Sequence, residues 1–351
     1  MSILFTPIKV GDLQLPNRIL MAPLTRCRAI GGGRIPNQLM LAYYVQRASA
    51  GLIFTEATAI SPMGVGYPDT PGIWSKEQVD GWKLITDAVH QAGGKIILQL
   101  WHVGRISDPY YLNGALPVAP SAIAAKGHVS LLRPERPFVT PRALALEEIP
   151  HIIDEYRQGA INAKLARFDG VEIHGANGYL LDQFLQDGSN TRTDRYGGSI
   201  ENRARLMLEV TDAVISVWGK GRVGMHLAPR GDAQSMGDSN PRATFGYVAQ
   251  ELGRRGIAFI CARESLGDDR IGPELKKIFG GVYIVNEKFD KKSAEAVIES
   301  KEADAVAFGK LFIANPDLPA RFKTEAPLNS PDPSTFYGSS AKGYTDYPSM
   351  G

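Results

Sequence analysis

GLIFTEA at residues 51–57 and KIILQLW at residues 95–101 are nearly continuous apolar runs, separated by an amphipathic stretch over 75–92. Such runs are typical of parallel strands that are buried on both faces. The intervening stretch begins with Ser75 and Gln78 three residues apart, as in a capping box, and ends at two glycines, so it predicts a helix. Residues 51–101 therefore predict a strand–helix–strand unit of a parallel sheet.

The same alternation continues along the chain in both directions. Eight strand–helix pairs is the number that closes a (β/α)8 barrel. A doubly wound sheet would instead need a G-x-G-x-x-G loop after its first strand, where this chain has TRCRAIGGGR. We therefore predict an α/β protein, a single TIM-barrel domain over residues 1–351. Its strands are expected over 18–24, 51–57, 95–101, 169–174, 222–228, 257–262, 282–286 and 304–308. Its helices are expected over 37–49, 75–92, 146–166, 199–218, 243–254, 273–279, 291–301 and 315–323.

Composition excludes several classes of protein. The 39 Lys and Arg residues nearly balance the 37 Asp and Glu residues, so the net charge of +2 does not indicate a nucleic-acid partner. No apolar stretch approaches the roughly 20 residues that span a bilayer, and the N-terminus lacks the pattern of a signal peptide. Cys27 and Cys261 lie far apart and suggest no disulfide framework. We expect a cytoplasmic protein that does not bind membranes, either a monomer or a homodimer.

Two connections and the C-terminal tail are unusually long. Residues 105–145 follow the third predicted strand and residues 179–198 follow the fourth, and long connections in compact domains are usually functional. Both follow strand carboxyl ends, the face on which barrel enzymes build their sites. The tail from residue 325 is rich in proline and serine, which favours disorder, but its aromatic residues favour docking on the barrel equally.

Polar side chains gather where the predicted strands end. After the fourth strand, His174 and Asn177 lie three residues apart, and Tyr179 follows two residues later. Two neighbouring donors can hold one oxygen atom as it gains negative charge, and a phenol beside them can deliver a proton. After the eighth strand, Gly309 and Lys310 resemble the phosphate site that barrels form near their last strands. Six histidines are present without a close ligand pair, so we predict no metal site.

These residues resemble the Old Yellow Enzyme family, and especially its bacterial xenobiotic, nitrate-ester and N-ethylmaleimide reductases. The resemblance covers essentially the whole chain, and its most specific block is HGANGYLLDQFL from His174 to Leu185. It implies a TIM barrel with bound FMN that takes hydride from NADPH or NADH. By ping-pong transfer it would then reduce the activated C=C bond of α,β-unsaturated carbonyl or nitro compounds, and nitrate esters or nitroaromatics are further candidates. The motifs that carry the resemblance are PLTR (23–26), QLWHVGR (99–105), GVEIHGANGY (170–179), QFLQ (183–186), RYGGS (195–199), NR (202–203) and FGK with NPD (308–317).

The resemblance also implies a role for individual residues. Thr25 would bond the flavin O4 and tune its electron affinity, Pro23 and Ala57 would line the ring, and Gln99 would bond its pyrimidine edge. His174 and Asn177 would hold the acceptor's oxygen, and Tyr179 would protonate the α-carbon after hydride reaches the β-carbon. The substrate space above the ring would be shaped by Tyr67, Trp101 and Tyr344, the last reaching in from a docked tail.

Three positions depart from the family pattern. The fifth strand ends in His226, where the family commonly has an arginine facing the flavin N1–O2 edge, so His226 or Arg230 would serve there. Lys310 stands where an arginine often holds the phosphate, which keeps the charge and loses the bidentate fork. The loop after the seventh strand lacks the usual glycines, and Asn286 is its expected phosphate contact.

Two other functions are compatible with a barrel. One is an aldolase or hydrolase that uses a lysine or a metal, but among the strand ends only Lys310 offers a lysine. The other is a barrel that binds flavin without catalysis, which would have no use for His174, Asn177 and Tyr179 around one substrate atom. A bound yellow chromophore and its turnover with NAD(P)H distinguish these alternatives from an ene-reductase.

Overall fold

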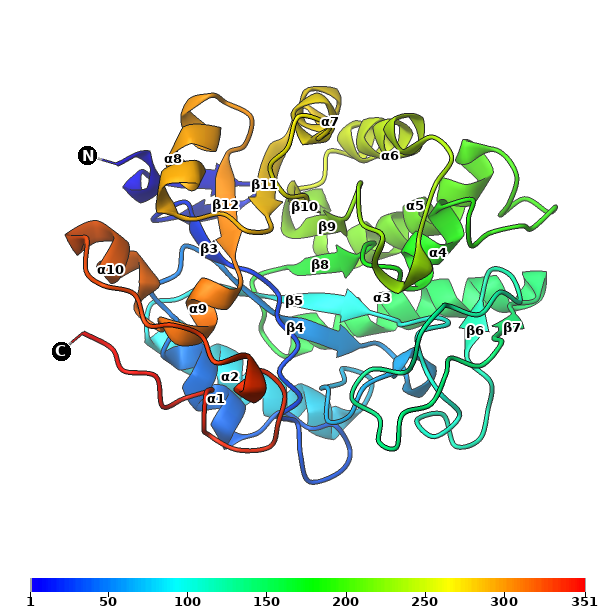
Figure 1. The fold of residues 1–351 in the computed structure, drawn as a ribbon, viewed down its shortest axis with the longest axis horizontal. Coiled ribbons are helices and arrows are strands. Elements are labelled where there is room, and N and C mark those ends of the chain that lie inside the picture. Colours follow the sequence, from blue (N-terminus) through cyan, green and yellow to red (C-terminus); the bar gives the residue numbers. More distant parts are fainter. Residues whose placement is uncertain (1, 351) are drawn as a thin grey trace.

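The computed structural model describes residues 2–350, and its centre is a closed barrel of eight parallel strands (Figure 1). The strands follow one another around the barrel in chain order, and the last pairs with the first, Val306 opposite Ile19. All eight predicted strands are confirmed, so the doubly wound sheet is excluded. The strands are β3 (Ile19–Met21), β4 (Ile53–Ala59), β5 (Ile96–Trp101), β8 (Val171–His174), β9 (Val223–Leu227), β10 (Phe259–Arg263), β11 (Val282–Asn286) and β12 (Ala305–Phe308).

Helices surround the barrel, and the capping signals work as predicted. Ser75 accepts from the backbone N–H of Gln78, and the Gln78 side chain accepts in return from the backbone N–H of Ser75. The eight predicted helices are α1 (Gln38–Val45), α2 (Lys76–Gln91), α3 (Ile149–Leu165), α5 (Ile200–Trp218), α6 (Pro241–Arg255), α7 (Gly272–Phe279), α8 (Lys291–Glu299) and α10 (Leu318–Thr324). Single 3-10 turns are η1 (Ile3–Phe5), η2 (Pro62–Gly64), η3 (Leu146–Glu148), η4 (Lys220–Arg222), η5 (Ala233–Ser235) and η6 (Pro333–Thr335).

Two short helices and an N-terminal hairpin were not predicted. All six residues of α4 (Leu180–Leu185) are buried, so the segment has no amphipathic period, and α9 (Lys310–Ala314) is too short to show one. The hairpin of β1 (Ile8–Val10) and β2 (Leu13–Leu15) packs its apolar side chains with those of the barrel interior. It turns at Gly11, whose φ of 57° and close approach to the carbonyl of Gly221 leave no room for a side chain.

The long connection after β5 lies beyond the strand ends, where Figure 1 shows its short paired strands β6 (Val118–Ala119) and β7 (Arg142–Ala143). Its apolar residues, among them Val129 and Phe138, pack with Tyr67 and Trp101 into a separate small core. This packing fixes the connection as a wall beside the carboxyl ends of β4, β5 and β8, on the face predicted to carry the site.

The C-terminal tail is docked on the barrel, so the alternative of a disordered tail is wrong. Arg26, in the connection that follows β3, donates to the carbonyls of Phe336 and Gly343 at 2.9 and 2.8 Å. Arg28 donates to the carbonyls of Thr335 and Phe336, each at 2.9 Å. Buried guanidinium groups thus satisfy backbone carbonyls of a tail whose regular structure is limited to the single turn η6.

Candidate functional site

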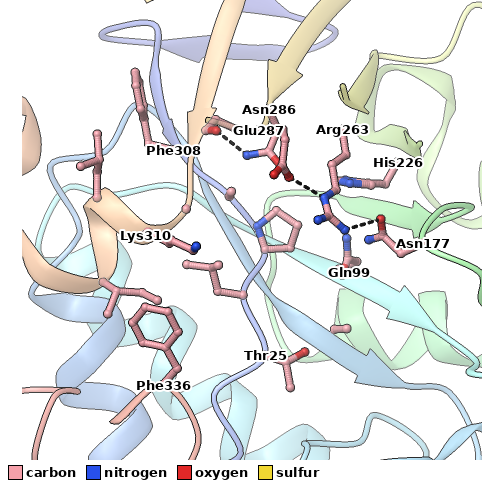
Figure 2. A pocket seen from close by; sticks show the side chains of 18 of the residues that line it. Thr25, Gln99, Asn177, His226, Arg263, Asn286, Glu287, Phe308, Lys310 and Phe336 are labelled. Atoms are coloured by element: carbon pink, nitrogen blue, oxygen red, sulfur yellow. Dashed lines mark hydrogen bonds and ion pairs between the residues drawn. The ribbon is translucent and has the colours of Figure 1, made fainter. Parts of the chain in front are cut away.

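A cavity of about 670 Å³ opens at the carboxyl ends of the strands (Figure 2). This volume is typical of sites for small ligands. Twelve of the predicted site residues line it: Pro23, Thr25, Ala57, Gln99, Trp101, His174, Asn177, Tyr179, His226, Asn286, Gly309 and Lys310. The barrel therefore brings together residues from seven of its strand ends or the loops that follow them.

One side of the cavity carries a free positive charge. Lys310 follows β12, and within residues 2–350 its ammonium group makes no hydrogen bond or ion pair with the protein. Figure 2 shows this ammonium turned into the cavity, on the opposite side from Asn177. The Asn286 side chain, expected to contact a phosphate, donates instead to the carbonyl of Ala307 at 2.6 Å and ties β11 to β12.

Below the cavity, Glu172 orients two of the lining side chains. This fully buried carboxylate accepts from Nε2 of Gln99 at 2.7 Å and faces Nδ1 of His226 at 3.3 Å. Because the Gln99 amide nitrogen is committed to Glu172, its carbonyl oxygen is left for an N–H group in the cavity. This orienting contact of Glu172 was not predicted from the sequence.

Glu172, His226 and Cys261 place one potential metal-ligand atom each within 4.8 Å of one another. The carboxylate already accepts from Gln99 and faces His226. Burial raises the pKa of the Cys261 thiol well above its usual value, which opposes the thiolate that a metal requires. The absence of a metal from the site stays a prediction.

The His174 imidazole is held as a neutral donor. Its Nδ1 accepts from the backbone N–H of Ala176 at 3.3 Å, so in the neutral ring Nε2 carries the proton. Burial, followed by the charges of His226 and Arg263, lowers the pKa of His174 well below its usual value. The ring therefore stays neutral and can donate one hydrogen bond from Nε2.

The Tyr179 phenol lies against His174 and Trp101, with ring centroids 5.0 Å from each. Burial raises its pKa to about 12, although a 2.9 Å hydrogen bond with the hydroxyl of Tyr67 lowers it in part. Tyr67 itself does not line the cavity, so the expectation that it shapes the substrate space directly is wrong. It acts on the site through the Tyr179 hydroxyl.

Two other predicted residues lie outside the cavity. Tyr344 is fully buried, and its ring stacks on that of Tyr43 with the centroids 4.0 Å apart. The arginines that bind the tail place the Tyr344 side chain there. The Arg230 guanidinium is held by Glu264, Asp269 and the carbonyl of Ser265, so the prediction that it reaches back to the cofactor is wrong.

Several lining residues were missed by the sequence analysis. The tail does enter the site, but with Phe336 and Tyr337 in place of Tyr344. Arg263, at the end of β10, contacts Asn177 and Glu287 at the edge of the cavity (Figure 2). Arg263 ends the sixth barrel strand, β10, and this position could have indicated that it lines the site. No local pattern distinguishes Tyr337 from the other tyrosines of the tail.

The cavity suits FMN. Lys310 offers a cation for a phosphate on one side, and Pro23, Leu24 and Ala57 offer apolar contact for a flat ring. Gln99 and His226, oriented by Glu172, present polar groups for the ring's edge. An elongated ligand with an anionic end and a flat polar-edged ring matches this arrangement.

Comparisons with known proteins agree with the geometry. Residues 3–329 match the NADH:flavin oxidoreductase / NADH oxidase family. The structure of morphinone reductase in complex with tetrahydroNAD is 50% identical, with a TM-score of 0.95, and covers 99% of this chain and 98% of that one. The Old Yellow Enzyme homologue of Zymomonas mobilis is 46% identical, with a TM-score of 0.96. The match covers 98% of this chain and 99% of that one. A probable flavin mononucleotide-dependent alkene reductase of Leishmania infantum is 44% identical over 99% of this chain and 98% of its own.

The fold, the cavity and these relatives support an ene-reductase and do not favour the aldolase, the hydrolase or the non-catalytic barrel. FMN is the cofactor, and a nicotinamide nucleotide is the hydride donor. The chain belongs to the NADH:flavin oxidoreductase / NADH oxidase family and is an FMN-dependent ene-reductase of the Old Yellow Enzyme type.

Proposed function

We propose that His174 and Asn177 hold the oxygen of an enone or nitroalkene and that Tyr179 protonates the substrate carbon. The observation that carries this proposal is the meeting of three neutral donors in one cavity, with the His174 tautomer fixed by the Ala176 N–H. FMN, when bound, would supply the redox chemistry between the nicotinamide and the alkene.

Each residue then has one task. The His174 Nε2–H and the Asn177 amide donate to the oxygen as it gains negative charge, and the loss of one such donor typically costs about 10²–10³ in rate. The Tyr179 phenol keeps its proton until a basic carbon forms beside it, because its pKa is about 12. Trp101, Tyr337 and the apolar wall after β5 limit the space that a substrate can occupy.

The remaining roles concern the cofactor. Thr25, Pro23, Ala57 and Gln99 are proposed to contact the flavin ring, and Lys310 with Gly309 to hold its phosphate. His226 is proposed at the ring's N1–O2 edge, because Arg230 is held elsewhere. We propose one domain for the whole chain, and the cytoplasm as its compartment, because both cysteines are free thiols.

The test separates the two half-reactions. Tyr179→Phe should slow reoxidation of the reduced enzyme by 2-cyclohexenone about 10²-fold, since it removes the proton donor. Flavin reduction by NAD(P)H should stay nearly intact in a stopped-flow measurement. Tyr110→Phe, at an exposed tyrosine, is the control. An equal fall in both half-reactions would contradict the role of Tyr179.

A second test addresses the oxygen-binding pair. His174→Ala or Asn177→Ala should each weaken phenol binding, followed by the long-wavelength absorbance that a phenol develops with oxidised flavin. Unchanged phenol affinity in both variants would remove the proposed role of His174 and Asn177.

A further inference from the structure

Arg263 bridges two loops that are far apart in the sequence. Its Nη1 donates to Oδ1 of Asn177 at 3.0 Å, and its Nε donates to Oε2 of Glu287 at 2.6 Å. Asn177 follows β8 and Glu287 follows β11, whereas Arg263 ends β10, so the guanidinium links loops that lie on either side of its own strand. Figure 2 shows this chain of contacts along the edge of the cavity.

The contact with Arg263 determines which end of the Asn177 amide faces the cavity. A guanidinium can only donate and the amide oxygen can only accept, so Oδ1 must face Arg263 and Nδ2 is left free to donate. Rotation about χ2 of an asparagine has two nearly equivalent orientations, so the backbone alone does not choose between them. Within residues 2–350, the amide of Asn177 has no other hydrogen-bond partner, so Arg263 alone determines which of the two orientations the amide adopts.

Glu287 holds the guanidinium in place. The side chain of Arg263 is 42% exposed, so without a second contact it would move freely in solvent. Glu287 has a φ of 99°, a conformation that glycine adopts without strain and a residue with a side chain rarely adopts. A strained position of this kind is kept where the side chain makes a contact that glycine could not make.

We infer that Arg263, held by Glu287, is a positioning residue that turns the Nδ2 group of Asn177 toward the oxygen of the acceptor. The inference rests on the proposed role of Asn177 as an oxygen donor. If the amide turned round, its own oxygen would face the substrate oxygen, and the two acceptors would repel. Arg263 thereby favours acceptors whose oxygen reaches the Asn177 amide, such as carbonyl and nitro compounds.

The test measures phenol binding to the FMN-loaded enzyme, whose FMN content is first checked by absorbance. Arg263→Met keeps the aliphatic stem and removes the donors, and should weaken phenol binding about tenfold. In an Asn177→Ala background the same substitution should change the phenol Kd less than about twofold, because its effect passes through Asn177. Arg242→Gln, which removes an exposed arginine paired with Glu274 on the outer surface, should leave the Kd unchanged.

Arg263→Lys separates positioning from charge. Lysine keeps the positive charge but loses the fork that serves two partners, so binding should stay within about threefold of the Met variant. Full recovery by lysine would overturn the inference in favour of a charge effect. An equal loss in the Asn177→Ala background, or no loss on Arg263→Met while Asn177→Ala weakens binding, would also overturn it. If Asn177→Ala itself had no effect, the proposed role of Asn177 would fail first.

Discussion

The donors around the acceptor site are kept neutral by burial. Burial lowers the pKa of His174 well below its usual value and raises the pKa of Tyr179 to about 12. Neither group changes its charge near neutral pH, so the site presents the same hydrogen atoms to a substrate across that range. The hydrogen bond with the Tyr67 hydroxyl, 2.9 Å from that of Tyr179, lowers the pKa of Tyr179 in part and so eases loss of its proton.

We therefore expect the reoxidation of reduced enzyme by an enone to be independent of pH between about pH 6 and pH 9. Loss of the Tyr179 proton would slow the step only as the pH approaches about 12. Stopped-flow reoxidation at a fixed enone concentration measures this directly. A titration near neutral pH in that half-reaction would show that a different group donates the proton.

At the scale of elements, the tail and the connection after β3 form one unit. Arg26 and Arg28 bind the tail's carbonyls, and Tyr344 lies between aromatic and guanidinium groups, with the Arg28 guanidinium 4.5 Å from its ring centroid. The Tyr344 hydroxyl is buried without a partner, whereas Tyr337 is 49% exposed and lines the cavity. Tyr344 and Tyr337 thus have separate tasks, the first in docking the tail and the second at the site.

Substitution of the two tyrosines should give opposite results. Tyr344→Phe removes only a hydroxyl that bonds nothing, so the Kd for an enone and the stability should change little. Tyr337→Ala should change the enone Kd severalfold with little effect on the melting temperature, because it enlarges the cavity at an exposed site. Ligand titration and thermal unfolding of both variants test this. A loss of enone binding in Tyr344→Phe alone would restore Tyr344 to the site.

The sequence predicted elements and strand-end residues well, and long-range contacts poorly. The barrel strands were predictable because buried parallel strands are continuous apolar runs, whereas α4 is buried all round and gives no period. Residues fixed by their own strand, such as Gln99 and His174, were placed correctly. Tyr344 and Arg230 were misplaced because partners far along the chain, Arg28 for the first and Asp269 for the second, set their directions.

For the molecule as a whole, the buried carboxyl of Glu56 makes the stability of the fold depend on pH. Glu56 in β4 is 1% exposed, and burial raises its pKa from 4.5 to about 7, although the backbone N–H of Arg26 and the Tyr44 hydroxyl donate to it. The unfolded chain releases this proton near pH 4.5, so the folded state binds more protons above that value. The contribution of Glu56 to stability is therefore complete below about pH 4.5 and is lost as the pH rises through 7.

We expect Glu56→Gln to flatten the fall in melting temperature between about pH 5 and pH 8, since glutamine cannot ionise. Unfolding should be one cooperative transition if the chain is a single domain. Thermal unfolding by circular dichroism gives both results, with Glu299→Gln at an exposed position as the control. Equal slopes against pH in the wild type and Glu56→Gln would show that Glu56 does not cause the dependence.

The docked tail has a consequence for how the enzyme matures. Phe336 and Tyr337 complete the cavity wall, yet they follow the last barrel strand, which ends at Phe308. Because the chain is made from its N-terminus, all eight barrel strands have been made before these aromatics. The barrel strands can assemble during synthesis. A closed flavin site forms only once the tail has docked, so the docking of one terminal segment completes a site that the barrel has already begun.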